Sequence, residues 1–290
     1  MTVSVEQQVE QVASALDAAG LFFGHGTDNA FDEAAWLVLE ACELDPSGDA
    51  IPWDQPLTVD QQASVQALLG RRIESGEPLA YLVNRAWFAG HDFFIDHRAI
   101  VPRSHIGEWI PDRFVPWRTD RPAASVLDLC TGSGCIAVAL ALAFPEAKVG
   151  GVDISREALA VAQINAVRQN VTGRVNFIEA DVFPVGGIYD LIVSNPPYVP
   201  DDVVSGLPYE YRAEPKIALA GGAEGLDILD KILNGARRYL RADGILVVEV
   251  GSSRELVEKR YPHLELMWIE SEDALAGVFV VDRVSLPSVR

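Results

Sequence analysis

The chain has 290 residues, 49% of them hydrophobic, so it is long enough to bury a large core and too apolar to be disordered throughout. Its formal net charge is −19, and residues 1–70 contain twelve carboxylates and neither lysine nor arginine. A surface this acidic repels phosphate backbones, which argues against direct, tight binding of nucleic acid and favours a basic protein partner.

Three cysteines, Cys42, Cys130 and Cys135, are too few for a disulfide scaffold. The N-terminus lacks the basic and apolar regions of a signal peptide, and the longest strongly apolar run, 136–144, is about half of the roughly 20 residues that a membrane-spanning helix needs. We therefore expect a cytoplasmic protein without a membrane partner. The five histidines show no metal-ligand spacing, so we expect no bound metal.

Residues 1–84 are predicted to form a small helical domain. Apolar residues recur at helical spacing in three places, Val9–Leu16, Trp36–Ala41 and Val65–Ile73. Segments rich in glycine, asparagine, aspartate and proline separate them, and Asn29 is placed to cap the second helix. The acidic charge of the chain is concentrated in this domain.

Residues 85–122 are predicted to form a β-hairpin followed by a linker. Phe88 and Phe93 lie on short apolar segments on either side of Gly90-His91, which is typical of a hairpin. Prolines at 102, 111, 116 and 122 then punctuate the chain. We therefore expect a domain boundary close to residue 122.

Residues 123–290 alternate between strand and helix patterns, which predicts an α/β fold with a doubly wound, mostly parallel, seven-stranded sheet. Ligands of such sheets bind beyond the carboxyl ends of the strands, so the residues at those ends are the candidates for a site. The expected strands are 125–130, 148–153, 175–181, 189–195, 244–250, 264–269 and 278–282, and the expected helices are 134–144, 156–169, 226–240 and 253–260.

The first strand end carries Asp128-Leu129-Cys130-Thr131-Gly132-Ser133-Gly134, directly before a helix. Gly132 and Gly134 permit a tight turn and the close approach of a ligand, and the helix N-terminus offers free N–H groups. Asp153 stands 21 residues after Gly132, at the next strand end, which is the spacing of an acid that binds ribose hydroxyls. Together these features predict a nucleoside-containing cofactor.

Two further strand ends add polar groups. Asp181 can accept a hydrogen bond from an adenine amino group, or it can be a solvated acid at the end of a strand. Ser194-Asn195-Pro196-Pro197-Tyr198 must leave the sheet in a rigid bend, because two successive prolines lack N–H groups. A stiff turn alone does not explain why an amide and an aromatic ring flank the prolines.

These motifs resemble the class I, Rossmann-like methyltransferases that use S-adenosylmethionine to methylate planar amide or amino nitrogens. Ala80-Tyr81-Leu82, Trp87-Phe88-Ala89-Gly90-His91 and Val101-Pro102-Arg103-Ser104 are similar to the HemK-type protein-glutamine methyltransferases, and the resemblance covers nearly the whole chain. It implies that the first domain recognises the substrate and that the third transfers a methyl group to the side-chain amide nitrogen of a glutamine.

Within that family, segments 24–29 and 102–108 are similar to the branch that modifies large-subunit ribosomal protein L3, a basic protein. The release-factor branch typically has Pro-Arg-Pro-Glu-Thr-Glu where this chain has Pro-Arg-Ser-His-Ile-Gly. Cys130 stands where many methyltransferases have the first glycine of the loop. This departure requires that residue 130 does not adopt a positive φ.

The resemblance also implies roles for single residues. Asn195 and the carbonyl of Pro196 would accept both hydrogens of the substrate amide, whose nitrogen is a poor nucleophile because its lone pair is delocalised. Tyr198 would pack on the flat amide, so Asn195, Pro196 and Tyr198 are the predicted catalytic residues, and Pro197 completes the predicted substrate site. S-adenosylmethionine would be bound by Asp128, Cys130, Thr131, Gly132, Ser133, Gly134, Asp153, Asp181, Val182 and Asn195.

Several alternatives stay open on the sequence. The substrate can be a peptide chain release factor, or the enzyme can methylate amino groups of nucleic acid, although that would require a basic surface. A nicotinamide dehydrogenase would share the glycine loop but has no use for 195–198. A non-catalytic assembly factor for a ribosomal protein would not need the intact motifs.

Two regions have no assigned role. Residues 195–226 show no clear secondary structure of their own, and loops of this length are usually functional, so we expect a lid or a substrate-binding loop. Arg103 and Glu108 can contact cofactor or substrate, or they can form an interdomain ion pair.

Overall fold

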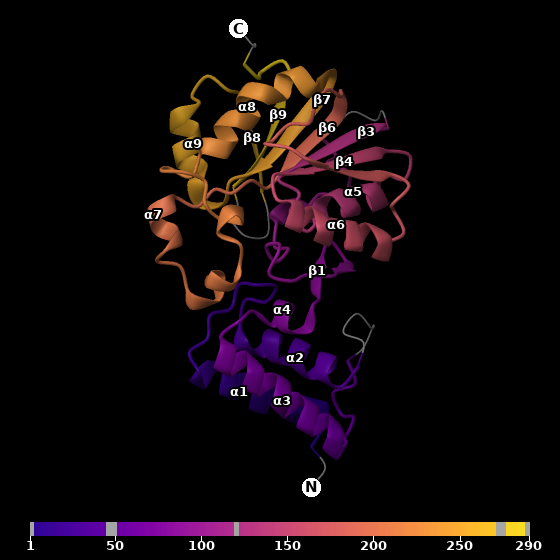
Figure 1. Cartoon of the computed structure of the whole chain (residues 1–290), viewed down its shortest axis with the longest axis vertical. Coiled ribbons are helices and arrows are strands. Elements are labelled where there is room, and N and C mark those ends of the chain that lie inside the picture. The colour runs from indigo at the N-terminus through magenta and orange to yellow at the C-terminus, as the bar shows by residue number, and fades with distance from the viewer. Residues whose placement is uncertain (1–2, 45–50, 119–121, 271–276, 288–290) are drawn as a thin grey trace. The chain divides into compact units, whose positions relative to one another are not determined.

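The structure is a computed structural model that describes residues 3–44, 51–118, 122–270 and 277–287 (Figure 1). Its internal contacts divide the chain into two compact units. The helical unit comprises Met1–Ala86 and Pro208–Glu214, and the sheet unit comprises Trp87–Leu207 and Pro215–Arg290. From Trp87 onward the predicted linker therefore groups with the sheet unit. No helix in the described ranges is both long enough and apolar enough to cross a bilayer.

The helical unit contains α1 (Val5–Ala18), α2 (Ala30–Ala41), α3 (Val59–Ser75) and the short α4 (Leu79–Val83). The three long helices each begin at a side-chain cap that accepts a hydrogen bond from a backbone N–H three residues further on, which satisfies a donor that the helix itself leaves unpaired. The predicted cap Asn29 is among them, with its Oδ1 2.9 Å from the N–H nitrogen of Asp32.

The apolar patterns of these helices form the core of the unit, with one exception. Val65 and Leu69 of α3 are buried as their spacing predicts. Ile73 continues the same pattern, but it is 37% exposed. The buried face instead ends on the side chain of Arg72, which is 1% exposed, and the helix ends at Gly76 in the left-handed conformation that glycine adopts without strain.

The hairpin predicted after the helical unit is present. β1 (Ala86–Phe88) and β2 (His91–Phe93) form a two-stranded sheet, and the rings of Phe88 and Phe93 lie 6.3 Å apart. The chain then passes through a short 3₁₀ helix, η1 (His105–Glu108). Phe88, Phe93 and Ile106 are buried in the same cluster as the helices on one face of the large sheet.

Within the described residues the large sheet has seven strands in the order β5-β4-β3-β6-β7-β9-β8. β9 is antiparallel to β7 and β8, and the remaining pairs are parallel, which confirms the predicted mostly parallel, doubly wound fold. The strand order reverses between β3 and β6, the place where such sheets bind ligands. The strands are β3 (Ser125–Leu129), β4 (Lys148–Asp153), β5 (Val175–Glu179), β6 (Tyr189–Ser194), β7 (Leu240–Glu249), β8 (Met267–Ile269) and β9 (Val278–Asp282).

Helices cover both faces of this sheet (Figure 1). α5 (Cys135–Ala143) and α6 (Arg156–Arg168) belong to one buried cluster, and α8 (Asp227–Tyr239) and α9 (Arg254–Arg260) belong to the other. Successive strand residues alternate between the clusters, as a pleated strand requires. Val126 of β3, for example, lies in the first cluster and Leu127 in the second.

The predicted element bounds need two corrections. β7 begins at Leu240, directly after α8, and β8 begins only at Met267. The long segment after β6 also has more structure than its sequence suggests, since it contains α7 (Asp201–Val204), η2 (Tyr209–Ala213) and η3 (Lys216–Ala218).

We call residues 199–225 the strap and Pro208–Glu214 the strap tip. Backbone hydrogen bonds close the base of the strap within the sheet unit: the Val199 N–H donates to the Leu219 carbonyl at 3.0 Å, and the Gly221 N–H donates to the Val199 carbonyl at 2.8 Å. The strap tip groups with the helical unit, although it begins 122 residues after Ala86, where the main segment of that unit ends. The sequence did not predict this placement.

Candidate active site

The glycine loop at the end of β3 has positive φ at three residues. The sequence predicts two of them and does not predict the third. Gly132 and Gly134 have φ of +54° and +76°. Gly134 must be glycine for packing as well, because a Cβ there would lie 2.7 Å from the Cβ of Ala162 in α6. Cys130 also has a positive φ, +58°, so the expectation that this residue avoids positive φ is wrong. A side chain in this region is strained by about 1–2 kcal/mol.

Asp128 is fully buried beneath the loop. Its Oδ2 accepts hydrogen bonds from the Thr131 hydroxyl and from the Ala137 N–H, and so ties both ends of the loop to the strand. Its Oδ1 is buried without a hydrogen-bond partner among the described residues. Burial raises the pKa of Asp128 to about 7, the main cause being desolvation of the charged form. The site therefore contains an acceptor with unused capacity.

Asp153, at the end of β4, lies directly beside the loop. Its Oδ2 accepts the Gly132 N–H and its Oδ1 accepts the Ser155 N–H, both at 2.8 Å. Burial raises the pKa of Asp153, and these N–H bonds oppose the rise. The structure thus brings together the glycine loop and the acid that sequence spacing had paired. Among the described residues, a Cβ on Gly132 would have one neighbour within 4 Å, Ile100 Cγ2 at an ordinary van der Waals distance of 3.8 Å, so this position is not crowded.

The remaining loop residues are held rigidly. Thr131 and Ser133 are buried, and the Ser133 carbonyl accepts a hydrogen bond from the Asn165 amide of α6 at 2.9 Å. Burial raises the pKa of the Cys130 thiol well above its usual value. Cys130 is therefore a neutral thiol at physiological pH, which does not suit it to act as a nucleophile.

Asp181 and Val182, after β5, differ from each other in their surroundings. The Asp181 carboxylate is 58% exposed and forms an ion pair with Lys231 of α8 at 2.8 Å. Val182 is 7% exposed and has φ of +67°, which is an outlier for a β-branched residue. Strained backbone of this kind clusters at functional sites.

The corner after β6 is surrounded by glycines that the sequence analysis missed. A Cβ on Gly221 would lie 2.6 Å from the Pro197 carbonyl oxygen, and one on Gly225 would lie 2.2 Å from the Tyr198 carbonyl oxygen. A Cβ on Gly251, after β7, would lie 2.7 Å from the Tyr198 ring. These three positions therefore let the backbone of the corner pack closely. The sequence indicates these glycines only by their position, after an expected strand and before an expected helix.

Two polar groups of the corner lack hydrogen bonds within the described residues, although Pro196 is buried. β6 ends at Ser194, whose hydroxyl donates to the Leu129 carbonyl at 2.9 Å and so joins the ends of β3 and β6. Within the described ranges, neither the Asn195 side chain nor the Pro196 carbonyl forms a hydrogen bond with another residue. Asn195 is half-buried. An amide and a carbonyl oxygen therefore follow directly on the switch point of the sheet.

A buried acid at the end of β7 was also missed. Glu249 is 2% exposed, and the Ser104 hydroxyl donates to its Oε2 at 2.6 Å. Burial is the main cause that raises its pKa. The register pairs Ser194 of β6 with Val248, so Glu249 lies at the same edge as Asn195. The signal available in the sequence was an acid at the end of a strongly apolar strand.

The two residues of the 102–108 segment without an assigned role lie in the sheet unit. Glu108 pairs with His105 at 2.8 Å, three residues away. The Arg103 guanidinium donates to the Val101 carbonyl at 3.4 Å. Both of these contacts are local, and the Ser104 hydroxyl attaches the same segment to Glu249.

Comparisons with known proteins agree with this arrangement. A family model described as a methyltransferase domain matches residues 120–273, and one described as the PrmC N-terminal domain matches residues 10–83. Among solved structures, the hMettl16 catalytic domain in complex with MAT2A 3'UTR hairpin 6 has a TM-score of 0.52 at 12% identity, over 77% of this chain and 81% of that chain. This similarity shows a shared fold.

Relatives named "Ribosomal protein uL3 glutamine methyltransferase" match almost the whole chain. That of Burkholderia pseudomallei is 44% identical over 99% of this chain and 96% of that protein. That of Neisseria gonorrhoeae is 44% identical over 94% of this chain and 92% of that protein, and that of Bordetella pertussis is 40% identical over 96% and 94%. The chain therefore belongs to the HemK-type protein-glutamine methyltransferase family, in the branch of the ribosomal protein uL3 glutamine methyltransferases.

Proposed function

We propose that this protein transfers a methyl group from S-adenosylmethionine to the side-chain amide nitrogen of a glutamine in ribosomal protein uL3. The observation that carries the proposal is the corner 195–198, where an amide and a carbonyl oxygen without hydrogen bonds to other described residues follow the strand at the switch point of the sheet. We also propose that the protein lies in the cytoplasm, because its proposed substrate is a ribosomal protein and because three free cysteines are stable there.

In this proposal Asn195 and the Pro196 carbonyl accept the two hydrogens of the glutamine amide and fix its nitrogen in place. Holding the reacting atoms about 3–3.5 Å apart and in line supplies much of the acceleration of such a transfer. The Tyr198 ring, whose approach the bare Gly251 permits, packs against the flat amide. We assign no general base, because the nitrogen becomes acidic only as the methyl group arrives.

The residues of the glycine loop fit S-adenosylmethionine, which supplies an electrophilic methyl group when bound. Asp128 has a buried oxygen without a partner among the described residues, which suits a cationic amino group, and no described residue crowds Gly132. We propose that Cys130–Gly134 contact the methionine portion, that Asp153 binds the ribose hydroxyls and that Val182 lines the adenine. The Lys231 ammonium donates to both oxygens of Asp181, at 2.9 and 2.8 Å, so for Asp181 the proposal requires a remaining lone pair of this exposed carboxylate to accept from the adenine amino group.

The choice of uL3 over the other candidate substrates rests on relatives and charge. The matched relatives carry the uL3 name over nearly their whole length. A net charge of −19 suits a basic protein and opposes nucleic acid. Incubation of the enzyme and tritiated S-adenosylmethionine with separated ribosomal proteins, release factors and RNA should label uL3 alone. Label in a release factor or in RNA, with none in uL3, would contradict the proposal.

The role of the corner is tested by Asn195→Ala. We expect kcat for uL3 methylation to fall at least 100-fold, because the amide nitrogen is no longer held in line. The dissociation constant for S-adenosylmethionine, measured by calorimetry, should change less than about fivefold, since most of the proposed cofactor contacts remain. Wild-type turnover with normal cofactor affinity would exclude this role for Asn195.

A further inference from the structure

The strap tip is anchored in the helical unit by buried groups. The Phe22 N–H donates to Oε1 of Glu210 at 2.7 Å, and the same oxygen lies 3.9 Å from the Arg72 guanidinium. Glu214 lies 3.7 Å from His25, and both are buried. Glu210 is itself 4% exposed. The strap tip is therefore an integral part of the helical unit.

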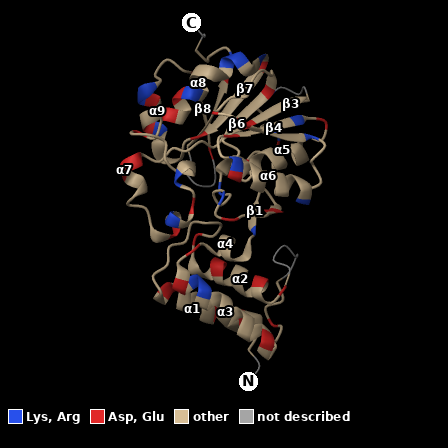
Figure 2. Cartoon of the chain, viewed as in Figure 1, with Lys and Arg blue, Asp and Glu red and all other residues tan. Residues whose placement is uncertain are grey.

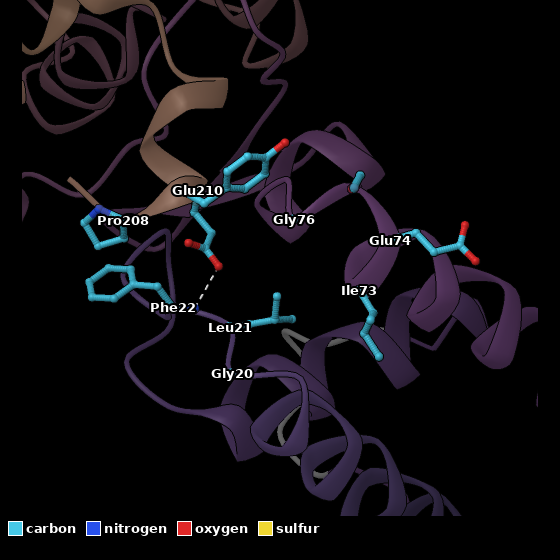
Figure 3. A pocket seen from close by; sticks show the side chains of 10 residues that line it. Gly20, Leu21, Phe22, Ile73, Glu74, Gly76, Pro208 and Glu210 are labelled. Atoms are coloured by element: carbon cyan, nitrogen blue, oxygen red, sulfur yellow. Dashed lines mark hydrogen bonds between the residues drawn. The ribbon is translucent and has the colours of Figure 1, made fainter. Parts of the chain in front are cut away.

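A pocket of about 430 Å³ lies where the strap tip meets the helices (Figure 3). Its walls include Leu21 and Phe22, which follow α1, Ile73 and Glu74 at the end of α3, and Tyr209 and Glu210 of the strap tip. Phe22, Ile73 and Tyr209 are 40%, 37% and 58% exposed, so this pocket has apolar walls open to solvent. The exposure of Ile73, which departs from its helical pattern, is explained by its place in this wall.

Tyr209 can form its wall only because the residue opposite is small. A Cβ on Gly76 would lie 2.6 Å from two ring carbons of Tyr209. Gly76 also has φ of +67°, so it both ends α3 and admits the ring. The pocket therefore depends on a helix end and a strap residue more than 130 positions apart in the chain.

The charge beside this pocket is negative on balance, because the carboxylates of Glu33, Glu74 and Glu210 outnumber two guanidinium groups, that of Arg72 and that of Arg212, which lies 5.4 Å from the centre of the Tyr209 ring. Two buried carboxylates, Glu33 and Glu210, share the single guanidinium of Arg72, with Glu33 at 2.8 Å. Within the described residues, Oε2 of Glu210 forms no hydrogen bond. Residues 1–86 contain fourteen carboxylates and three arginines, and the strap tip adds two carboxylates and one arginine. Acidic residues accordingly predominate on this unit in Figure 2.

We propose that the pocket binds a basic side chain, a lysine or an arginine, of the substrate protein. Such a side chain has an apolar stem and a charged head. Its stem would lie along Leu21, Ile73 and Tyr209, and its head would approach the Glu210 carboxylate, with Glu74 at the rim. This inference rests on the proposed function for the identity of the protein that carries the side chain. It adds a docking site outside the residues that handle the glutamine.

The pocket wall lies close in the sequence to the corner that holds the substrate amide. The wall residue Pro208 follows Tyr198 by ten residues, so the wall that holds the basic side chain and the corner that holds the amide belong to one short stretch of chain. Docking stabilises the strap tip, because a ligand stabilises the state that it binds. We therefore expect the pocket to act on the affinity for the protein substrate and not on the binding of S-adenosylmethionine.

The test uses Ile73→Lys and Glu74→Lys, which place a positive charge on the pocket wall at exposed positions. Glu10→Lys is the matched control, because it makes the same charge change as Glu74→Lys at an exposed site of α1 that does not line the pocket. We expect the KM for uL3 to rise about tenfold in Ile73→Lys and about fivefold in Glu74→Lys, with kcat within twofold of wild type. Glu10→Lys should change KM less than twofold at physiological salt, where distant surface charges are screened.

A second measurement locates the contact. Hydrogen exchange of the wild-type protein should slow in segments 20–22 and 208–210 when uL3 is added, and Ile73→Lys should lose this protection. A KM within twofold of wild type in Ile73→Lys, or equal rises in Glu10→Lys and Glu74→Lys, would overturn the pocket while leaving the proposed function intact. Failure of the wild-type protein to methylate uL3 would instead overturn the proposed function, and the occupant assigned to the pocket with it.

Discussion

Each of the two units buries carboxylates, but they do so in different ways. In the sheet unit, Asp128 and Asp153 stand at the ends of neighbouring strands and accept hydrogen bonds mainly from nearby backbone N–H groups. In the helical unit, Glu33 and Glu210 share Arg72 although they are 177 residues apart in the chain. The first arrangement is local, and the second exists only once the strap tip has docked.

This difference decides what each carboxylate can be used for. Asp128 retains an oxygen without a partner in the described chain and a pKa of about 7, so its charge is open to change by a ligand. Glu33 is held by Arg72 through a charge-assisted hydrogen bond at 2.8 Å and serves to fix structure. Asp128 thus keeps an acceptor oxygen without a partner in the described chain, whereas Glu33 and Glu210 of the helical unit share Arg72 and help to hold the strap tip.

The largest effect expected from this comparison is that of Arg72→Met. Removing the cation leaves Glu33 and Glu210 buried without it, and breaking a buried ion pair from one side costs about 3–5 kcal/mol. Hydrogen exchange should report this loss as faster opening of α2 and α3, and the strap tip should lose its protection. Arg71→Met, one residue away and exposed, is the control and should cost less than about 0.5 kcal/mol.

The pH dependence of Arg72→Met follows from Glu33. Burial already raises the pKa of Glu33, and Arg72 opposes that rise, so the pKa increases further in the variant. The folded state then binds more protons than the unfolded state, and its stability falls as pH rises through the pKa of the folded form. The deficit of Arg72→Met should therefore shrink as pH is lowered from 7 to 5. A deficit that is independent of pH would show that Glu33 does not carry the penalty.

A smaller and opposite effect is expected in the sheet unit for Asp128→Asn. The raised pKa of Asp128 means that the wild-type protein without cofactor loses stability between about pH 4 and 7, because the carboxyl is ionised in the unfolded state but still protonated in the folded state. Three pKa units correspond to about 4 kcal/mol. An unsatisfied amide donor in the variant offsets about 2 kcal/mol of this. We therefore expect the variant to be about 2 kcal/mol more stable at pH 8.

Thermal unfolding of both proteins between pH 5 and 8 checks this expectation. The advantage of Asp128→Asn should be largest at pH 8 and should vanish or reverse at pH 5, where the wild-type carboxyl is protonated. Calorimetric titration should show weaker binding of S-adenosylmethionine to the variant, by about tenfold, if the carboxylate holds the cofactor. A constant difference across the pH range would mean that the folded carboxyl is already ionised at pH 5, and that burial does not raise the pKa of Asp128.

The same contrast explains what could be predicted from the sequence. The sheet, its order of strands and helices, and the pairing of Gly132 with Asp153 follow from apolar periodicity and from the rule that parallel strands present their carboxyl ends at one edge. The positive φ of Cys130 could not be predicted, because the surrounding structure imposes this strained backbone and the identity of the side chain does not indicate it. The contact between Glu210 and Phe22 could not be predicted either, because no sequence periodicity relates residues 188 positions apart.

The smallest expected effect concerns the strained backbone of Cys130, which belongs to the glycine loop of the sheet unit. Cys130→Gly should stabilise the protein by up to about 1 kcal/mol, since the relief of a left-handed side chain exceeds the entropy that glycine loses on folding. Gly134→Ala, four residues on and also at positive φ, should destabilise it, because its Cβ would meet Ala162. Urea unfolding measures both, with Cys130→Ala as the control that keeps the Cβ and should gain nothing. A Cys130→Gly protein that is more stable and equally active would show that the strain is incidental, whereas lower turnover would show that the strained loop contributes to the site.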